Sequence, residues 1–340
     1  MPRKQEYEDD EAYSESEDVE QSASDAESEA SDAESEAESE AESQASDASS
    51  EYDSDDEDLY VDYVESDLTG SRKAVLIGIN YPDSESPLEG CWNDVANMQE
   101  YITEHWGFDE DNTMVLTDDQ DPDSELFPTR ANILAAMEWL VEDAEPNSSL
   151  WLHFSGHGVQ EDDDGNDEAD GQDEAICPVD YEEAGTIIDD EMNRILVQKL
   201  PEGARLTVIF DCCHSGSALD LPLIYDATGK RIKQHKKKVE DGVEISHDER
   251  NERKKGTASD VIFFSGCQDN QTSADTENKQ VGKTGALSYA LLKTLQETEG
   301  EISYIDLLTA VRDHMKETDE TQVPQLSSAH KMDMSTIFRV

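Results

Sequence analysis

Basic residues are scarce in this sequence, where 25 Lys and Arg stand against 84 Asp and Glu and the formal net charge is −59. Such a charge is repelled by phosphate backbones, which argues against nucleic acid as a partner, and it favours basic partners and divalent cations. The five cysteines are an odd number in a long chain, so we expect no disulfide framework. A reducing compartment is therefore favoured, namely the cytosol, with the nucleus as the alternative. No apolar run reaches membrane-spanning length and the N-terminus lacks an apolar leader, so we expect no membrane association.

The first part of the sequence, residues 1–70, is acidic and of low complexity. It holds 28 Asp and Glu but only two basic residues, and the unit Ser-Asp-Ala-Glu-Ser-Glu-Ala occurs at Ser24–Ala30 and again at Ser31–Ala37. Such a segment has too few apolar side chains to offset the conformational entropy that folding would cost. We therefore predict a disordered acidic tail rich in Ser, Glu, Asp and Ala, followed by a folded domain over residues 71–340.

From residue 71 onward, apolar runs typical of buried strands alternate with segments of helical periodicity. This alternation predicts an α/β fold with a largely parallel sheet flanked by helices on both faces. Thr129 is the expected N-cap of the second helix. The predicted strands cover residues 73–80, 112–117, 149–155, 175–178, 205–211, 261–266 and 336–340, and the predicted helices cover residues 91–105, 129–143, 188–200, 285–297 and 303–316.

A histidine and a cysteine each follow one of these apolar runs. His157 comes after a run that ends in Ser-Gly, and Cys213 comes after another run and is followed by His-Ser-Gly. Parallel strands deliver such residues to their carboxyl ends, where open α/β sheets keep their active sites. The two side chains can then form a thiolate–imidazole pair, which is the arrangement of peptidase and acyl-transfer chemistry.

Three neighbouring residues have other interpretations. Cys212 is a rival nucleophile, but adjacent side chains of a strand point to opposite faces, and a buried cysteine usually acts as a small hydrophobic residue. His153 and His214 are expected to be structural.

Four short patterns occur in order along the chain and together resemble a known family. They are Leu88-x-Gly-Cys-x-Asn-Asp94, Ser155-Gly-His-Gly158, Ile188-Asp-Asp-Glu191 and Asp211-x-Cys213-His-Ser-Gly-Ser217. The set resembles the type I metacaspases, which are cysteine peptidases of the caspase fold, and the resemblance runs from about residue 72 to residue 340. It implies a caspase-like sheet with a large and a small portion in one chain, cleavage after Arg or Lys, and activation by calcium.

The resemblance also implies roles for individual residues. His157 would take the proton of the Cys213 thiol and later protonate the leaving amine, and the backbone N–H groups of Gly158 and Cys213 would form the oxyanion hole. Asp94 matches the family's acidic position in the substrate pocket, and Asp211 lies two residues before the cysteine and so on the same side of its strand. Two carboxylates suit a guanidinium, or an ammonium as a point charge. The alternative for Asp94 is a contact with its own helix.

A calcium site is the next expectation. The segment Glu161–Glu174 is mostly acidic, which is usually typical of a solvated loop, and it does not fit an EF-hand. With Gly171 at position six of such a loop, the twelfth residue would be Cys177 rather than Glu. Hard carboxylate oxygens nevertheless suit Ca²⁺, and no Cys–His spacing supports zinc. The resemblance assigns calcium, as an activator that orders the loop behind the nucleophile, to Asp173, Asp189, Asp190 and Asp220.

Ten of the 25 basic residues fall between Lys230 and Lys255, in a segment without apolar periodicity that we predict to be a surface loop. A peptidase that cuts after Lys or Arg would find a substrate in its own loop, so we predict autoprocessing there. The cut would separate a large portion, at about 71–229, from a small portion, at about 258–340. The alternative is a basic patch or nuclear signal. The candidate sites are Lys230, Arg231, Lys233, Lys236, Lys237, Lys238, Arg253, Lys254 and Lys255, with Arg72 and Lys73 as a second location.

The expected function is thus that of a calcium-activated cysteine endopeptidase acting on protein or peptide substrates with basic P1 residues. A non-proteolytic caspase-fold adaptor in stress or protein-aggregate handling is the alternative, although an adaptor has no need for the paired His, Cys and carboxylates. A third hypothesis keeps the peptidase and gives it a trigger other than calcium. The resemblance suggests a monomer, on which the sequence itself is silent.

Overall fold

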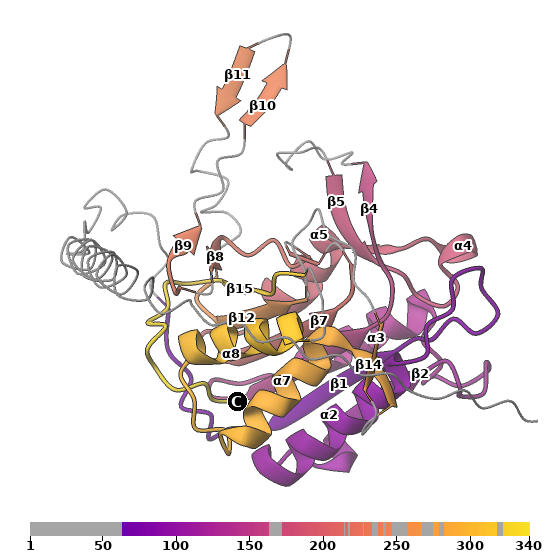
Figure 1. Cartoon of the computed structure of the whole chain (residues 1–340), viewed down its shortest axis with the longest axis horizontal. Coiled ribbons are helices and arrows are strands. Elements are labelled where there is room, and N and C mark those ends of the chain that lie inside the picture. The colour runs from indigo at the N-terminus through magenta and orange to yellow at the C-terminus, as the bar shows by residue number, and fades with distance from the viewer. Residues whose placement is uncertain are drawn as a thin grey trace, which may run out of the picture. The chain divides into compact units, whose positions relative to one another are not determined.

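The structure of the protein, a computed structural model, describes most of the chain after residue 62 (Figure 1). The described residues are 63–162, 172–213, 215–216, 218–226, 228–232, 237–240, 243–246, 257–266, 275–278, 282–317 and 322–340. The predicted acidic tail, apart from residues 63–70, lies outside them.

An eight-stranded sheet forms the centre of the domain. Its strand order is β2-β1-β3-β7-β12-β15-β8-β9, and the first five of these strands run parallel, whereas the last three each pair antiparallel with the strand before. The strands are β1 (Arg72–Gly78), β2 (Thr113–Thr117), β3 (Ser149–Ser155), β7 (Arg205–Asp211), β8 (Leu223–Tyr225), β9 (Arg231–Ile232), β12 (Asp260–Ser265) and β15 (Gln325–Ser328). The predicted α/β fold with a largely parallel sheet is confirmed.

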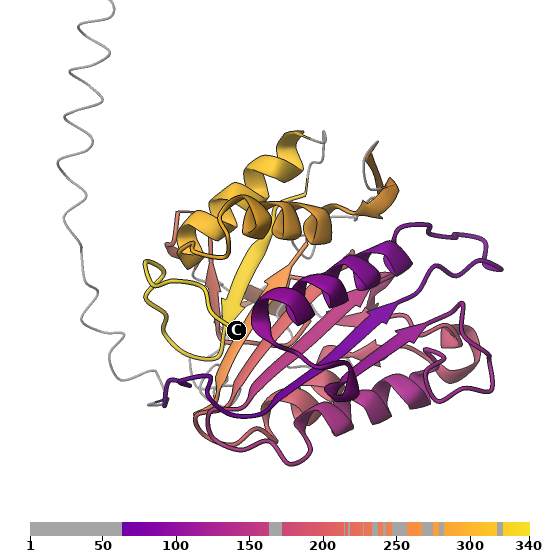
Figure 2. The ribbon, with the colours of Figure 1, turned by 90° about the horizontal axis from the view of Figure 1, so that it is seen from below.

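Helices cover both faces of this sheet, as Figure 2 shows. The helices α2 (Cys91–Trp106), α7 (Ala286–Glu297) and α8 (Tyr304–Glu317) lie on one face, and α3 (Arg130–Val141) and the π-helical turn η2 (Asn193–Val197) lie on the other. The remaining helical turns are η1 (Glu110–Asn112), α4 (Tyr181–Ala184) and α5 (Asp189–Met192). Thr129 accepts a hydrogen bond from the backbone N–H of Asn132 and so caps α3, as the sequence predicted.

Alternation along β1 separates two hydrophobic cores. Val75 and Ile77 pack into the core beneath α3, while Ala74 and Leu76 pack into the core beneath α2 and α7. All seven residues of β3 and all seven of β7 are buried, which explains why their sequences are almost continuously apolar.

Within the part of the chain that the structure describes, shorter strands form three smaller sheets. The strands β4 (Gly158–Asp162), β5 (Gln172–Ile176) and β6 (Ile187–Ile188) make an antiparallel sheet that begins directly after His157. The other two are hairpins of β10 (Lys237–Glu240) with β11 (Val243–Ser246) and of β13 (Asp275–Asn278) with β14 (Gly282–Gly285).

The predicted C-terminal strand at 336–340 is wrong. Only Ile337 makes an isolated bridge, to Ser303, and the last strand of the sheet is β15, some ten residues earlier. Phe338 and Val340 are instead buried in the core beneath α8, so their apolar character serves packing rather than strand pairing. The sequence Gln-Leu-Ser-Ser of β15 lacks the β-branched residues that mark a strand, which explains why it was missed.

Among the described residues, none of the helices combines the length and the apolar character needed to cross a membrane.

A buried ion network lies where β7 and β12 begin, at the opposite end of the sheet from His157. The Asp260 carboxylate, with no exposed surface, pairs with the Arg205 guanidinium at 2.6 Å and accepts a hydrogen bond from His330 Nε2 at 2.7 Å. The guanidinium also donates to the Tyr304 hydroxyl at 2.9 Å and to the backbone carbonyl of Arg339 at 3.0 Å. The network therefore joins β7, β12, α8 and the C-terminal segment.

Replacing Asp260 by alanine would leave the Arg205 charge buried without its counter-ion. We expect the free energy of unfolding to fall by about 3–5 kcal/mol, measured by urea denaturation. The control is Glu138→Ala, which removes a surface ion pair with Lys199 and should change the free energy by less than about 0.5 kcal/mol. Equal losses in the two variants would contradict a structural role for the buried network.

Candidate active site

The carboxyl ends of β1, β3 and β7 meet at one edge of the sheet. The strand order reverses between β1 and β3, and in open α/β sheets ligands bind at such a point. Ser155, the last residue of β3, pairs with Asp211, the last residue of β7. His157 and Cys213 each follow two residues later, so the register of these two strands delivers both predicted catalytic residues to the same edge.

The His157 ring is oriented by contacts with the segment that follows β1. Its Nε2 atom lies 2.7 Å from the backbone carbonyl oxygen of Ser86. A carbonyl oxygen only accepts hydrogen bonds, so in the neutral ring Nε2 carries the proton and Nδ1 carries the lone pair. Nδ1 is thus the atom that can accept a proton from a thiol. The ring also packs against that of Tyr81, with 4.6 Å between centroids.

The two adjacent cysteines occupy different environments. Cys213 is partly exposed, whereas Cys212 is 1% exposed and belongs to the hydrophobic core beneath α3. A Cβ atom at Gly158 would lie only 2.1 Å from the backbone carbonyl oxygen of Cys213 and 3.1 Å from the sulfur of Cys212. Only glycine therefore fits at position 158, and its backbone lies against that of Cys213, the two residues assigned to the oxyanion hole.

The two carboxylates of the predicted substrate pocket are brought together and are both buried. Asp94 accepts hydrogen bonds from the Ser155 hydroxyl at 2.7 Å, from the Thr284 hydroxyl, and from the Gly285 backbone N–H at 3.0 Å. Its carboxylate is therefore bound by β3 and by the junction of β14 with α7. The alternative from the sequence, a contact with its own helix, does not account for these hydrogen bonds. Asp211 accepts from the backbone N–H of Ser288, at 2.7 Å.

The junction of β14 with α7 covers both carboxylates. A Cβ atom at Gly285 would lie 2.2 Å from an Asp211 oxygen and 3.0 Å from an Asp94 oxygen, so the backbone itself fills the space above them. The backbone N–H groups that point at the two aspartates belong to the N-cap of α7, Gly285, and to its first turn, Ser288, where the helix dipole favours negative charge. A cationic side chain could reach these carboxylates only after this junction has moved aside.

Burial and the neighbouring Asp211 carboxyl raise the pKa of Asp94 to about 7. Burial disfavours the charged form, and a second carboxylate close by disfavours it further. Hydrogen bonds from Thr284, Ser155 and Gly285 act in the opposite direction. The pair therefore gains its full negative charge only near or above neutral pH.

Of the two histidines predicted to be structural, the structure describes only His153. His153 is fully buried, its Nε2 lies 2.9 Å from the Ser288 hydroxyl, and burial lowers its pKa to about 3. It is therefore neutral, in keeping with a structural role. His214 lies outside the described residues.

Three of the four aspartates predicted to bind calcium lie together. Oxygens of Asp189, Asp190 and Asp220 are within 4.8 Å of one another, and the first and last of these side chains are buried. Asp220 adopts a left-handed backbone conformation, with φ of 52°. The fourth residue, Asp173, is buried in β5 and does not belong to this group of three. Asp189 also accepts hydrogen bonds from the backbone N–H groups of Glu174 at 3.2 Å and Asp190 at 2.7 Å. The hard carboxylate oxygens of the group are of the type that suits Ca²⁺.

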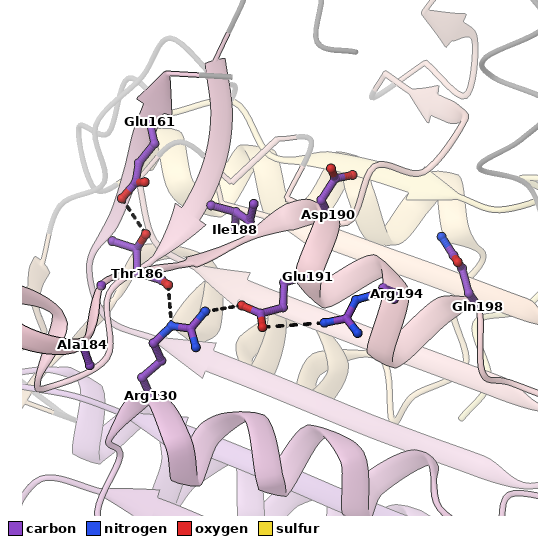
Figure 3. A pocket seen from close by; sticks show the side chains of 10 residues that line it. Arg130, Glu161, Ala184, Thr186, Ile188, Asp190, Glu191, Arg194 and Gln198 are labelled. Atoms are coloured by element: carbon purple, nitrogen blue, oxygen red, sulfur yellow. Dashed lines mark hydrogen bonds and ion pairs between the residues drawn. The ribbon is translucent and has the colours of Figure 1, made fainter. Parts of the chain in front are cut away.

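An open pocket of about 660 Å³ adjoins the calcium candidates (Figure 3). At its floor Glu191 pairs with Arg130 and, at 3.7 Å, with Arg194, and Arg130 also donates to the Thr186 carbonyl at 2.9 Å. Asp190 points away from this network. Arg130, at the start of α3, thereby fixes the segment that carries the calcium candidates Asp189 and Asp190.

The predicted autoprocessing sites fall in three environments. Lys230 and Arg231 lie at β9, and Lys237 and Lys238 lie in β10. Arg72 and Lys73 lie in β1, where both are paired with β3. The other candidates, Lys233, Lys236, Arg253, Lys254 and Lys255, lie outside the described residues.

Several residues of the site were not predicted from the sequence. Tyr81, Thr284 and Ser288 contact the predicted residues through a hydroxyl or a backbone N–H, and Ser86 does so through its carbonyl. Contacts made by backbone groups cannot be predicted from residue types, because every residue carries the same carbonyl and nearly every residue the same N–H. The hydroxyl of Ser155 lies within one of the four patterns, and its position two residues before the histidine was the one available signal.

Comparisons with known proteins agree with this fold. A crystal structure of a protein from Geobacter sulfurreducens superimposes with a TM-score of 0.54, at 23% sequence identity, over 79% of this chain and 97% of that one. It shows that the fold recurs elsewhere. A family described as "Metacaspase, peptidase C14 domain" matches residues 72–222.

Fungal sequences give the stronger similarity. Metacaspase-1A of Aspergillus oryzae is 46% identical over 302 residues, covering 79% of this chain and 70% of the relative. Metacaspase-1B of Aspergillus terreus is 43% identical, covering 79% and 78%. Metacaspase-1 of Cryptococcus neoformans is 43% identical, covering 80% of this chain and 65% of its own length. The chain belongs to the metacaspase family, as its sequence patterns indicated, and the family supports a cysteine-type peptidase with protein substrates.

The raised pKa of Asp94 predicts a pH dependence of stability. A carboxyl whose pKa is higher in the folded state stabilises the fold when protonated, and this contribution is lost as the pH rises towards about 7. Asp94→Asn cannot ionise, so its stability relative to wild type should increase between about pH 5 and about pH 8. Urea denaturation at both pH values would measure this.

The control for this experiment is Asp333→Asn. The pKa of that exposed carboxyl is held below its usual value by hydrogen bonds from Ser335, so its removal should not produce the same increase. A wild-type and an Asp94→Asn protein with parallel pH dependence would contradict the assignment.

Proposed function

We propose that this protein is a calcium-activated cysteine endopeptidase that cleaves after Arg or Lys. The observation that carries the proposal is the arrangement at the ends of β3 and β7, where a partly exposed cysteine and a histidine of fixed tautomer lie beside two buried carboxylates. His157 Nδ1 would take the thiol proton of Cys213 and return it to the leaving amine. The backbone N–H groups of Gly158 and Cys213 would stabilise the oxyanion.

The specificity for basic residues follows from charge. Asp94 and Asp211 offer carboxylate oxygens to a guanidinium or an ammonium and would repel an acidic P1 residue. Access requires the Thr284–Gly285 segment to withdraw, because it covers both carboxylates. In this proposal an arriving cation replaces the backbone and hydroxyl donors that hold the two carboxylates.

The role proposed for calcium is structural. Asp189, Asp190 and Asp220 supply the hard oxygen ligands that Ca²⁺ prefers, and Asp173 lies in β5, which pairs with the strand directly before Asp189. When bound, the ion would neutralise these carboxylates and order the chain behind the nucleophile, since Asp220 lies seven residues after Cys213. The ion pairs of Glu191 with Arg130 and Arg194 support this by anchoring the segment that carries two of the ligands.

Autoprocessing is proposed in the basic segment between Lys230 and Lys255. Cleavage at Arg72–Lys73 would require β1 to leave the centre of the sheet, since both residues are paired with β3.

We further propose that the protein is cytosolic and monomeric and that it has no nucleic-acid or membrane partners. The strands β15, β8 and β9 extend the sheet beyond β12, so β12 is not an edge available to a second copy.

The first experiment compares wild type, Cys213→Ala and Cys212→Ala on Arg-terminated and Asp-terminated fluorogenic peptides, with millimolar calcium or with chelator. We expect cleavage of the Arg peptide only, dependent on calcium, and a loss of about 10³-fold or more in kcat/KM for Cys213→Ala. Cys212→Ala, the matched control, should retain activity. Mass spectrometry of the same samples should show self-cleavage after Lys or Arg between 230 and 255 in wild type and Cys212→Ala, but not in Cys213→Ala.

Each failure in that experiment has a distinct meaning. Cleavage that persists in chelator would support the peptidase assignment but would show that calcium is not its trigger. Absence of cleavage by folded wild-type protein with calcium would favour a non-proteolytic adaptor.

The second experiment measures calcium binding directly. Asp190→Asn removes one charge from the three clustered carboxylates and should weaken Ca²⁺ binding by about tenfold or more in isothermal titration calorimetry, because affinity depends on the number of charged ligands. The control, Asp111→Asn, changes an exposed aspartate outside this group. Unaltered calcium affinity in Asp190→Asn would show that the ion binds elsewhere.

A further inference from the structure

Both restraints on the His157 ring come from one short segment, residues 80–88. Ser86 supplies the carbonyl that fixes Nε2, and Tyr81 supplies the ring that packs against the imidazole. Within this segment, Ser84 N–H donates to the carbonyl of Tyr81 at 3.0 Å and Leu88 N–H donates to the carbonyl of Asn80 at 2.8 Å. The position of the Ser86 carbonyl therefore depends on how the start of the segment is held.

The Tyr81 hydroxyl connects two chain segments at the site. It accepts a hydrogen bond from the His157 backbone N–H at 3.0 Å and donates one to the Cys177 carbonyl at 2.6 Å. The side chain is 2% exposed, and burial raises the pKa of the phenol well above its usual value, so it stays neutral and keeps its proton for donation. Removing this hydroxyl would leave the His157 N–H and the buried Cys177 carbonyl without this partner.

The backbone of Tyr81 is strained. Its φ of 47° lies in the left-handed region, which is uncommon for a residue with a bulky side chain. The Asp118 carboxylate holds this conformation by accepting hydrogen bonds from Tyr81 N–H at 2.7 Å, from Asn80 N–H at 2.9 Å and from Trp92 Nε1 at 2.6 Å. Strained residues persist only where their surroundings fix them, and they are often found at functional sites.

We propose that Tyr81 is a positioning residue for His157, held in place by Asp118, and that it keeps the imidazole aligned so that Nδ1 faces Cys213. This inference rests on the proposed peptidase function and deepens it. The phenol fixes the backbone of His157 and one face of its ring, while the loop that begins at Tyr81 fixes Nε2. With both restraints in place, the ring is held through its backbone, one face and Nε2. Misplacement of a catalytic group by about 1 Å is enough to slow a reaction substantially.

The test replaces Tyr81 by phenylalanine, which removes the hydroxyl and retains the ring. Tyr225→Phe is the matched control, because Tyr225 is also buried and its hydroxyl accepts one backbone N–H, from Met332 at 2.9 Å. For Tyr81→Phe we expect kcat on the Arg peptide to fall by about tenfold while KM changes by less than about twofold. Tyr225→Phe should match wild type in both constants.

A second measurement does not depend on any peptide. The rate of Cys213 alkylation by iodoacetamide, followed by mass spectrometry across pH, reports the reactive thiolate. Other titratable groups near this site are Cys212 after β7, Cys177 after β5 and Glu161 on β4, and all are unchanged in the variant. Alkylation of Tyr81→Phe should be slowed more at about pH 6, where the thiolate depends on its imidazole partner, than at about pH 9, where thiols ionise unaided.

Thermal unfolding of each protein checks that it is folded. A second variant, Asp118→Asn, tests the residue that holds Tyr81. It keeps the phenol but replaces a carboxylate that accepts three N–H groups by an amide, so it should shift the alkylation profile in the same direction. Wild-type alkylation profiles in both variants, or an equal change in Tyr225→Phe, would overturn the inference. If wild type cleaves no peptide while Tyr81→Phe still shifts the alkylation profile, the proposed substrate class fails and the positioning role stands.

Discussion

The parallel pairing of β3 with β7 is the constraint on which the site depends. Seven residue pairs, from Ser149 with Arg205 to Ser155 with Asp211, fix where each strand stops. A slip of one residue would turn every side chain of a strand to the opposite face. Asp211 would then face the apolar core that holds Phe210. His157 and Cys213 would no longer follow the two strands at the same level. The buried apolar side chains of both strands enforce this register, so the core and the chemistry are specified by the same residues.

Among the described residues, buried charged groups lie at both ends of this sheet. At the carboxyl ends of the strands, Asp94, Asp118 and Asp211 each accept backbone N–H groups, two of them from the first turn of α7 or its cap. At the other end, Asp260 is paired with Arg205 and with the histidine at position 330. One end thus gathers carboxylates that a basic ligand could neutralise, while the other is already neutralised internally. The two ends of the sheet therefore differ, with carboxylates held by N–H donors at one end and an ion-paired network at the other.

Much of the fold and the centre of the site could be predicted from the sequence, because strong local signals marked them. Continuous apolar runs marked β1, β3, β7 and β12, and the residues that follow two of them marked the His–Cys pair. The three strands beyond β12, namely β15, β8 and β9, were missed because they are short and antiparallel, and β15 is polar. The contacts of Tyr81, Ser86 and Gly285 were missed because they are made by backbone groups or across long loops. Periodicity reports burial of side chains, whereas these contacts arise only when distant turns are brought together in three dimensions.

The interleaving of the strands has a consequence for a molecule cut between Lys230 and Lys255. The strands β12 and β15, which follow that segment, lie between β7 and β8, which precede it. Both pieces would stay together by pairing on either side, but they would no longer be joined as one chain. Refolding would become a bimolecular reaction and lose the effective concentration that the covalent link provides. A cut molecule that unfolds would be lost at cellular dilution, so its working life would be set by its unfolding rate. Self-cleavage would thereby limit the lifetime of the cleaved molecule.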